Sequence, residues 1–122
     1  MSIIDKIDET EFWNSKNVLV TGGSGFLGSV VVEKLRGFGT RSVVVPRKVD
    51  YDLRDRSSIN RLLESTKPDY LIHLAAHVGG IGANREYPGE FFYDNAIMGI
   101  ELIEQARLHQ VEKTLVVGTV CS

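Results

Sequence analysis

The sequence predicts an α/β domain built on a doubly wound parallel sheet, and three observations lead to this prediction. Short apolar segments alternate with longer segments of helical periodicity, a pattern typical of parallel strands joined by right-handed crossovers. The stretch Val18–Gly28 (VLVTGGSGFLG) joins a strand to a helix through a glycine-rich turn. The length of 122 residues fits one domain or part of one. We expect the strand order 3-2-1-4-5, truncated after the fifth strand, with a ligand at the switch point beside the first strand.

The first half of the chain alternates between strand and helix. After an N-terminal arm or short helix over residues 1–16, Asn17–Thr21 is the first strand, because its apolar run predicts burial on both faces. Phe26–Arg36 follows as a helix, with Val30 among the residues expected to face inward. Ser42–Val45 (SVVV) is the second strand, and the proline after it prevents its continuation as a central strand.

The second half repeats the alternation. Ser57–Thr66 carries apolar residues at the spacing of one helical face, with Asp55 or Ser57 as its N-cap. Three further segments complete the pattern: the fourth strand Tyr70–Leu74 (YLIHL), the long helix Gly89–His109 and the fifth strand Thr114–Gly118 (TLVVG).

Composition excludes several classes of protein. Hydrophobic residues make up 43% and charged residues 25% of the chain, as in ordinary globular proteins. The net charge of −2 predicts neither a nucleic-acid partner nor an anionic membrane surface. No apolar run approaches the ~20 residues of a membrane span, and Met1–Asn14 lacks a secretory apolar core, so we expect a cytoplasmic protein. The single cysteine, Cys121, excludes an internal disulfide, and we expect no metal site.

The glycine turn has the composition of a diphosphate site. Gly22 lets the chain turn sharply off the strand, Gly25 lets a diphosphate approach the backbone, and Gly28 lets the helix pack closely on the strand. The backbone N–H groups of Ser24–Leu27 then point into the anion site at the helix N-terminus. A glycine-rich turn alone is weak evidence. At the switch point of the predicted sheet, it favours a Rossmann-like dinucleotide-binding domain, of which residues 17–122 are the N-terminal part.

The residues after the second strand favour NADP over NAD as the cofactor. NAD-dependent enzymes usually place an acid here for the ribose hydroxyls, whereas NADP users accommodate the 2′-phosphate with a cation. Here the chain reads Val45-Pro46-Arg47-Lys48, with no acid before Asp50. Arg47 is the expected phosphate contact because its guanidinium is a planar fork of donors. NAD is the runner-up, and a solvated basic loop is the alternative interpretation.

Two other segments are candidates for the same site. Asp52 would accept a hydrogen bond from the adenine amine and Leu53 would cover the ring, although these aspartates are also suited to capping a helix. The small residues of the run Leu74-Ala75-Ala76 would let the ribose and diphosphate lie against the backbone. His77 follows at the mouth of the site as a candidate ligand contact, whereas we interpret His73 as a packed core histidine.

Together these motifs resemble the extended short-chain dehydrogenases/reductases, the superfamily of NAD-dependent epimerases and dehydratases. The resemblance rests on TGGSGFLG, the DLRD turn, HLAA after the fourth strand, and Asn95 in the long helix. The loop HLAAHVGGIGANREYPGEFFYDN and the terminal GTVCS are more particular and resemble the GDP-L-fucose synthases, which are NADP-dependent epimerase-reductases. The resemblance covers about Asn17 to Ser122.

The resemblance implies roles for individual residues. Those matching cofactor contacts are Gly22, Gly25, Phe26, Leu27 and Gly28 at the diphosphate, Asp52 and Leu53 at the adenine, and Ala75 and Ala76 along the cofactor. Asn95 matches an asparagine that supports the active site, and Thr119 matches the residue that hydrogen-bonds the substrate's keto oxygen. Cys121 matches a cysteine that, with a later histidine, moves protons at the sugar carbons being epimerised. Without the family pattern, Cys121 reads as a small buried hydrophobe.

The implied reaction epimerises a nucleotide-linked 4-keto-6-deoxy sugar at carbons 3 and 5, and hydride from NADPH then reduces carbon 4. The resemblance also implies a homodimer of the full-length protein, packed through the long helix. The superfamily's Tyr-x-x-x-Lys pair does not occur here, because none of Tyr51, Tyr70, Tyr87 and Tyr93 is followed by lysine four residues on. We therefore expect an N-terminal piece of a longer enzyme, inactive by itself.

Two alternatives stay open. One is an NAD-dependent nucleotide-sugar 4-epimerase or 4,6-dehydratase, against which Arg47 and Cys121 argue. The other is a non-catalytic dinucleotide-binding sensor module, which would lack the Tyr-x-x-x-Lys pair. A reading frame that continues past Ser122 into that pair would exclude the sensor.

Overall fold

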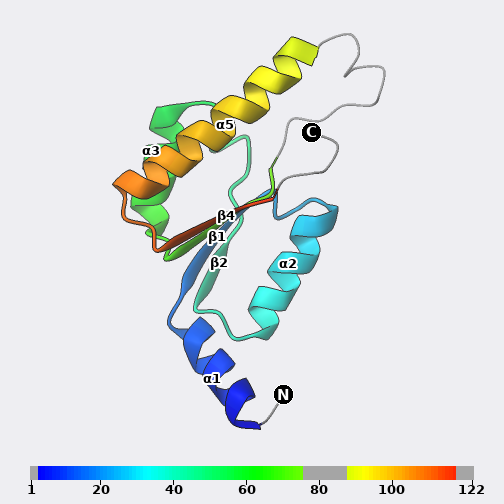
Figure 1. The fold of residues 1–122 in the computed structure, drawn as a ribbon, viewed down its shortest axis with the longest axis vertical. Helices are drawn as coiled ribbons and strands as arrows, with labels where there is room; N and C mark the ends of the chain where they lie inside the picture. Colours follow the sequence, from blue (N-terminus) through cyan, green and yellow to red (C-terminus); the bar gives the residue numbers. More distant parts are fainter. Residues whose placement is uncertain (1–2, 76–87, 118–122) are drawn as a thin grey trace.

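The computed structural model describes residues 3–75 and 88–117, with side chains from residue 9 onward (Figure 1). The helices are α1 (Ile3–Asn14), α2 (Phe26–Gly37), α3 (Arg56–Thr66) and α5 (Pro88–Leu108), and the strands are β1 (Asn17–Thr21), β2 (Ser42–Val44), β3 (Tyr70–His73) and β4 (Lys113–Val116). Each predicted element that lies within the described residues is present, with ends shifted by one or two residues. No helix in this part of the chain is long and apolar enough to cross a membrane.

The strands form one parallel sheet in the order β2-β1-β3-β4, which confirms the α/β fold. The five-strand order 3-2-1-4-5 is not confirmed, because the described residues contain no strand outside β2. The reason lies in residues 45–55, whose backbone makes local turns instead of a ladder. The amides of Asp50 and Tyr51 both donate to the carbonyl of Arg47, at 3.0 and 2.9 Å. The predicted fourth and fifth strands are therefore β3 and β4.

Helices cover both faces of the sheet (Figure 1). Leu19 and Leu71 point into a core shared with α3 and α5, where Leu62 and Leu102 are fully buried. Val18 and Val20 point to the other face, where they pack with Val32 and Leu35 of α2. Burial on both faces explains why the central strands are continuous apolar runs rather than alternating ones.

The prediction that Val30 faces inward is wrong. Val30 is 41% exposed, whereas Val32 and Leu35 are buried. Residues two apart on a helix lie on different faces, while residues three or four apart share one. The inward face is therefore set by Gly28, Val32 and Leu35, and Val30 lies on the opposite side.

Helix α1 packs at the end of the sheet where its parallel strands begin (Figure 1). Trp13 stacks on Phe38 with ring centroids 6.0 Å apart and meets Tyr70, the first residue of β3, edge-on at 5.9 Å. The carbonyl of Trp13 also accepts a hydrogen bond from the amide of Arg41 at 3.1 Å. These contacts tie α1 to the chain entering β2 and β3.

Helix α3 begins as its sequence predicts. Asp55 is its N-cap and accepts from the backbone N–H of Ser57. The hydroxyls of Ser57 and Ser58 also donate to this carboxylate, and these bonds lower the pKa of Asp55. Of the two candidate caps, Asp55 is the correct one.

Candidate functional site

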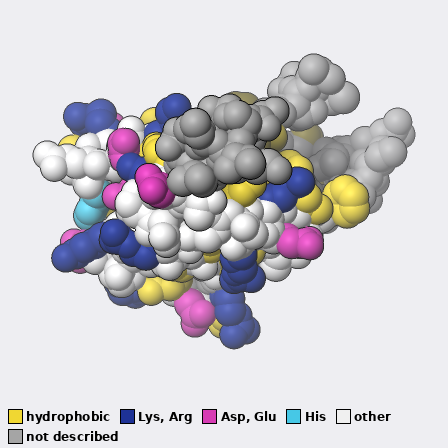
Figure 2. Space-filling view, turned by 90° about the horizontal axis from the view of Figure 1, so that it is seen from below, with side chains coloured by type: hydrophobic (Ala, Val, Ile, Leu, Met, Phe, Trp, Pro, Cys, Tyr) yellow, Lys and Arg dark blue, Asp and Glu magenta, His cyan; other side chains and the backbone are white. Residues whose placement is uncertain are grey.

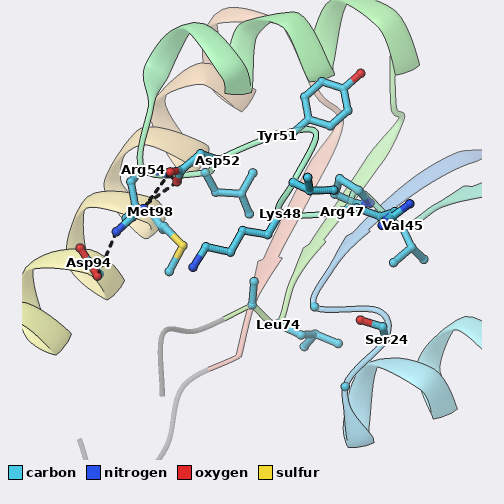
Figure 3. Close-up of a pocket in the computed structure, with 16 residues that line it drawn as sticks. Ser24, Val45, Arg47, Lys48, Tyr51, Asp52, Arg54, Leu74, Asp94 and Met98 are labelled. Atoms are coloured by element: carbon cyan, nitrogen blue, oxygen red, sulfur yellow. Dashed lines mark hydrogen bonds and ion pairs between the residues drawn. The ribbon is translucent and has the colours of Figure 1, made fainter. Parts of the chain in front are cut away.

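A cleft of about 750 Å³ opens at the carboxyl ends of β1, β2 and β3 (Figure 3). In the sheet β2 lies on one side of β1 and β3 lies on the other, so the strand order reverses at β1. The cleft therefore lies at the predicted switch point. Its lining residues are Gly22, Ser24, Gly25, Val45, Pro46, Arg47, Lys48, Val49, Tyr51, Asp52, Leu53, Arg54, Leu74, Ala75, Asp94 and Met98.

The glycine turn forms one wall of the cleft, and the geometry explains why Gly22, Gly25 and Gly28 carry no side chain. Gly22 has φ +74°, and a Cβ there would lie 2.7 Å from both the carbonyl carbon of Leu74 and the amide nitrogen of Ala75. A Cβ on Gly28 would overlap the carbonyl of Gly22, so this glycine lets α2 approach the turn. A Cβ on Gly25 would meet only the Gly22 oxygen, at 3.4 Å. Gly25 therefore leaves open space inside the cleft.

The glycine turn leads directly into the N-terminus of α2, which has no side-chain cap among the described residues. Gly25 is its N-cap residue, and within the described residues it makes no side-chain cap hydrogen bond. The unpaired N–H groups and the helix dipole make such an end attractive to anions. Phe26 and Leu27 do not line the cleft, and the Phe26 side chain is 94% exposed. The predicted role of these two residues at the diphosphate stays a prediction.

The loop after β2 forms the opposite wall, and two adjacent cations lie near its start. Arg47 and Lys48 both line the cleft. Figure 3 shows Lys48 extending toward the side where α5 carries Asp94 and Met98, whereas Arg47 extends toward Val45 and Ser24. The sequence favoured Arg47 alone; in the structure Arg47 and Lys48 extend to different sides of the cleft, and Arg54 is a third cation among its lining residues.

Asp52 lies in the cleft as part of a network with α5. Its carboxylate accepts from Nε and Nη2 of Arg54 at 3.0 and 2.8 Å, and Nη1 of Arg54 lies 3.4 Å from Oδ2 of Asp94. The hydrogen bonds from Arg54, assisted by the charges of Arg54 and Lys48, lower the pKa of Asp52 to about 2. Asp52 is therefore a carboxylate, able only to accept. The neighbouring Leu53 is buried and lines the same cleft.

The end of β3 forms the floor. Leu74 and Ala75 both line the cleft, and their contact with a cofactor stays a prediction. His73, one residue earlier, is 6% exposed, and its Nδ1 lies 2.6 Å from Oγ1 of Thr21. Burial lowers the pKa of His73. The interpretation of His73 as a packed, hydrogen-bonded core residue is confirmed.

The remaining candidates fall into two groups. Asn95 lies in α5 and is half-buried, but the residue that lines the cleft there is its neighbour Asp94. Ala76, His77, Thr119 and Cys121 lie outside the described residues, so their roles stay predictions.

Sequence reasoning missed Arg54, Asp94 and Met98 as cleft residues. A signal for two of them was present, because Asp94 and Met98 are four residues apart and share one helical face with Leu102 and Gln105. The sequence analysis included Arg54 only as part of the DLRD motif. Its ion pair with Asp94 joins residues 40 positions apart, and such a contact cannot be predicted from sequence spacing.

Comparison with known proteins agrees with this geometry. Residues 18–122 match the NAD dependent epimerase/dehydratase family. The chain is 36% identical over 107 residues to the putative GDP-L-fucose synthase 2 of Arabidopsis thaliana, covering 88% of this chain and 33% of that protein. It is 40% identical over 88 residues to the GDP-L-fucose synthase of Dictyostelium discoideum, covering 70% of this chain and 28% of that protein.

A solved structure extends the likeness to three dimensions. The GDP-L-fucose synthetase from Naegleria fowleri bound to NADP has a TM-score of 0.72 to this chain at 30% identity, covering 84% of this chain and 30% of that one. The chain spans about a third of the length of the curated relatives it matches. The family match extends from β1 through β4 and includes the glycine turn and the cleft floor, and the chain belongs to the NAD dependent epimerase/dehydratase family.

Proposed function

We propose that residues 17–122 form the dinucleotide-binding part of an NADP-dependent epimerase-reductase that acts on a nucleotide-linked 4-keto-6-deoxy sugar, in the manner of a GDP-L-fucose synthase. One observation carries the proposal. One cleft at the switch point of the sheet is lined both by Gly25, the N-cap of α2 without a side-chain cap bond, and by two adjacent cations, Arg47 and Lys48. The named relatives, one of them a structure bound to NADP, support this choice.

The described residues fit a dinucleotide. Its diphosphate would lie at Gly25 and the first turn of α2, where a Cβ is missing and the described residues provide no side-chain cap. Arg47 or Lys48 would hold the 2′-phosphate, and Asp52 would accept from the adenine amine. Bound NADPH supplies the hydride for carbon 4 of the sugar; the residues of this chain bind and orient it.

The roles of the residues that would take part in the reaction are proposed from the resemblance alone. Asn95 would support the active site, Thr119 would hydrogen-bond the keto oxygen, and Cys121 would move protons during epimerisation. No tyrosine among these 122 residues is followed by lysine four residues on. We therefore expect these residues alone to bind the cofactor without reducing the sugar.

We also propose that the full-length protein is a homodimer through α5. Phe92, Ile100 and Ile103 are 76%, 62% and 50% exposed, and their spacing places them on the face of α5 directed away from the sheet. The resemblance implies a second copy on this face. By contrast, the face seen in Figure 2 intersperses basic and acidic side chains, which does not favour a nucleic-acid partner. The homodimer predicts that Ile100→Glu lowers the mass of the full-length protein measured by light scattering.

A fluorescence titration with NADPH and, separately, NADH tests the cofactor. We expect tighter binding of NADPH, because each charge-assisted contact to the 2′-phosphate contributes about 1.5–3 kcal/mol. Arg47→Ala and Lys48→Ala identify which cation reads the phosphate, and Lys34→Ala on the exposed side of α2 is the matched control. Tighter binding of NADH by the folded protein would contradict the NADP proposal and favour an NAD-dependent 4-epimerase or 4,6-dehydratase.

A further inference from the structure

Thr21 and His73 form a buried pair beneath the cleft without lining it. They are register partners at the ends of β1 and β3. Thr21 is 0% exposed and His73 is 6% exposed. The distance of 2.6 Å between Oγ1 of Thr21 and Nδ1 of His73 is that of a hydrogen bond.

The other partners of the Thr21 hydroxyl decide the direction of that bond. The backbone nitrogens of Leu74 and Ala75 lie 3.1 and 3.3 Å from Oγ1. Backbone N–H groups only donate, so the hydroxyl accepts from Ala75 and shares the N–H of Leu74, which also donates to the carbonyl of Thr21 at 2.9 Å. Its own proton is then left for Nδ1 of His73. With the bond in this direction, Nδ1 of His73 carries no proton, and the proton of the neutral ring is on Nε2.

This arrangement fixes the two sides of the cleft relative to each other. Leu74 and Ala75 are its floor, and Gly22 begins the glycine wall. The chains touch here, because a Cβ on Gly22 would be 2.7 Å from the backbone of both floor residues. A shift of the β3 end would therefore change the space available beside the glycine turn. Burial lowers the pKa of His73, which favours the neutral ring, the only form in which one ring nitrogen can accept a hydrogen bond.

We propose that Thr21 and His73 are positioning residues for the dinucleotide: the Thr21 hydroxyl, oriented by the unprotonated Nδ1 of His73, holds the backbone of Leu74 and Ala75 against Gly22. The inference rests on the proposed function for the identity of the ligand. The contacts themselves belong to the protein without ligand. Neither residue touches the cofactor; both act through the backbone of the cleft floor.

Paired substitutions test the proposal. Thr21→Val keeps the shape and removes the hydroxyl, whereas Thr21→Ser keeps the hydroxyl. His73→Leu removes the acceptor, whereas His73→Asn keeps an acceptor oxygen near the position of Nδ1. We expect Thr21→Val and His73→Leu to weaken NADPH binding about tenfold, because each leaves a buried polar group unpaired. Thr21→Ser and His73→Asn should bind within about threefold of the unchanged protein, since the hydrogen bond is retained.

Two further measurements separate positioning from stability. Leu71→Ala removes a buried side chain two residues before His73 on the same face of β3 and should lower Tm without changing the NADPH Kd. Nitrogen NMR of the ligand-free protein should show the His73 ring protonated on Nε2. A proton on Nδ1, or a Thr21→Val protein that binds NADPH as well as the unchanged one, would overturn the inference. Should Thr21→Val not fold, equal NADPH affinities of His73→Leu and His73→Asn would overturn it. Failure of the unchanged protein to bind NADPH would instead contradict the proposed function, while the NMR result still decides the hydrogen-bond direction.

Discussion

Arg54 grips the carboxylate of Asp52 with two nitrogens, Nε to Oδ1 at 3.0 Å and Nη2 to Oδ2 at 2.8 Å. Its third nitrogen, Nη1, lies 3.4 Å from Oδ2 of the buried Asp94. A single guanidinium thus connects the loop after β2 to α5 along one side of the cleft (Figure 3). A bidentate pair of this kind fixes orientation as well as charge.

Replacing the guanidinium of Arg54 should change the pKa of Asp52. We predict that Arg54→Met raises the pKa of Asp52 from about 2 toward its ordinary value, because the hydrogen bonds from Arg54 are the main cause of the shift. NADPH binding should weaken, since the carboxylate loses its fixed orientation. Carboxyl-carbon NMR against pH measures the first effect and fluorescence the second. Arg107→Met removes a comparable exposed pair with Glu104 and should change neither; an unchanged Asp52 pKa in Arg54→Met would contradict the assignment.

Alanine substitutions of two glycines in the turn should affect stability and NADPH binding differently. Gly25→Ala should alter the free energy of unfolding by only about 0.5 kcal/mol, because the backbone at Gly25 is extended and its Cβ would have room. It should nevertheless weaken NADPH binding about tenfold or more, because the methyl group occupies the anion site.

Gly28→Ala should behave oppositely, because its Cβ would overlap the Gly22 carbonyl. We predict a destabilisation of about 3 kcal/mol, seen in the urea midpoint. Gly37→Ala is the control, since a Cβ there meets nothing within 4 Å and the position ends α2. A Gly25→Ala protein that binds NADPH normally would move the diphosphate away from this turn.

The sequence was sufficient for the features that follow from local spacing and composition. The apolar runs predicted the strands, the face Ile59, Leu62 and Leu63 predicted α3, and the glycines predicted the wall of the cleft. The third strand of a five-stranded order was an expectation from fold analogy, and residues 45–55 form turns instead. Val30 shows the same limit, because three consecutive valines leave the inward face ambiguous until the helix packs.

Contacts between residues far apart in the chain could not be predicted from the sequence. The partners Arg54 and Asp94 are 40 residues apart, and Thr21 and His73 are 52 apart. No periodicity connects such pairs; the parallel register of β1 and β3 does. The same reasoning explains why Lys48 was passed over for Arg47, since two adjacent cations differ only in where the folded loop directs them.

Stability should fall in acid because of His73. Burial lowers its folded-state pKa below the unfolded value near 6.5. Between these two values the unfolded chain binds a proton that the folded chain does not, so stability rises with pH there. The contribution of His73 is therefore present above pH ~6.5 and is lost as pH falls through the folded pKa. Urea midpoints measured across this window should fall with pH, and His73→Asn should flatten the fall; an equal slope in both proteins would exclude His73 as the cause.

Trp13 should report on α1 and not on the cofactor. Its ring packs on Phe38 and Tyr70 at the end of the sheet opposite the cleft. We predict that NADPH leaves the emission maximum of Trp13 unchanged while the fluorescence of the cofactor itself changes on binding.

Trp13→Leu should destabilise the fold by about 1–3 kcal/mol, because it removes the stacked and edge-on ring contacts. The change should lower Tm and leave the NADPH Kd unchanged, since the hydrogen bond from Arg41 to the Trp13 carbonyl involves only backbone atoms and is kept. Phe12→Leu, at a neighbouring and more exposed ring, is the matched control and should cost less. A Trp13→Leu protein with unchanged Tm and weakened NADPH binding would show instead that α1 acts on the cleft through the sheet.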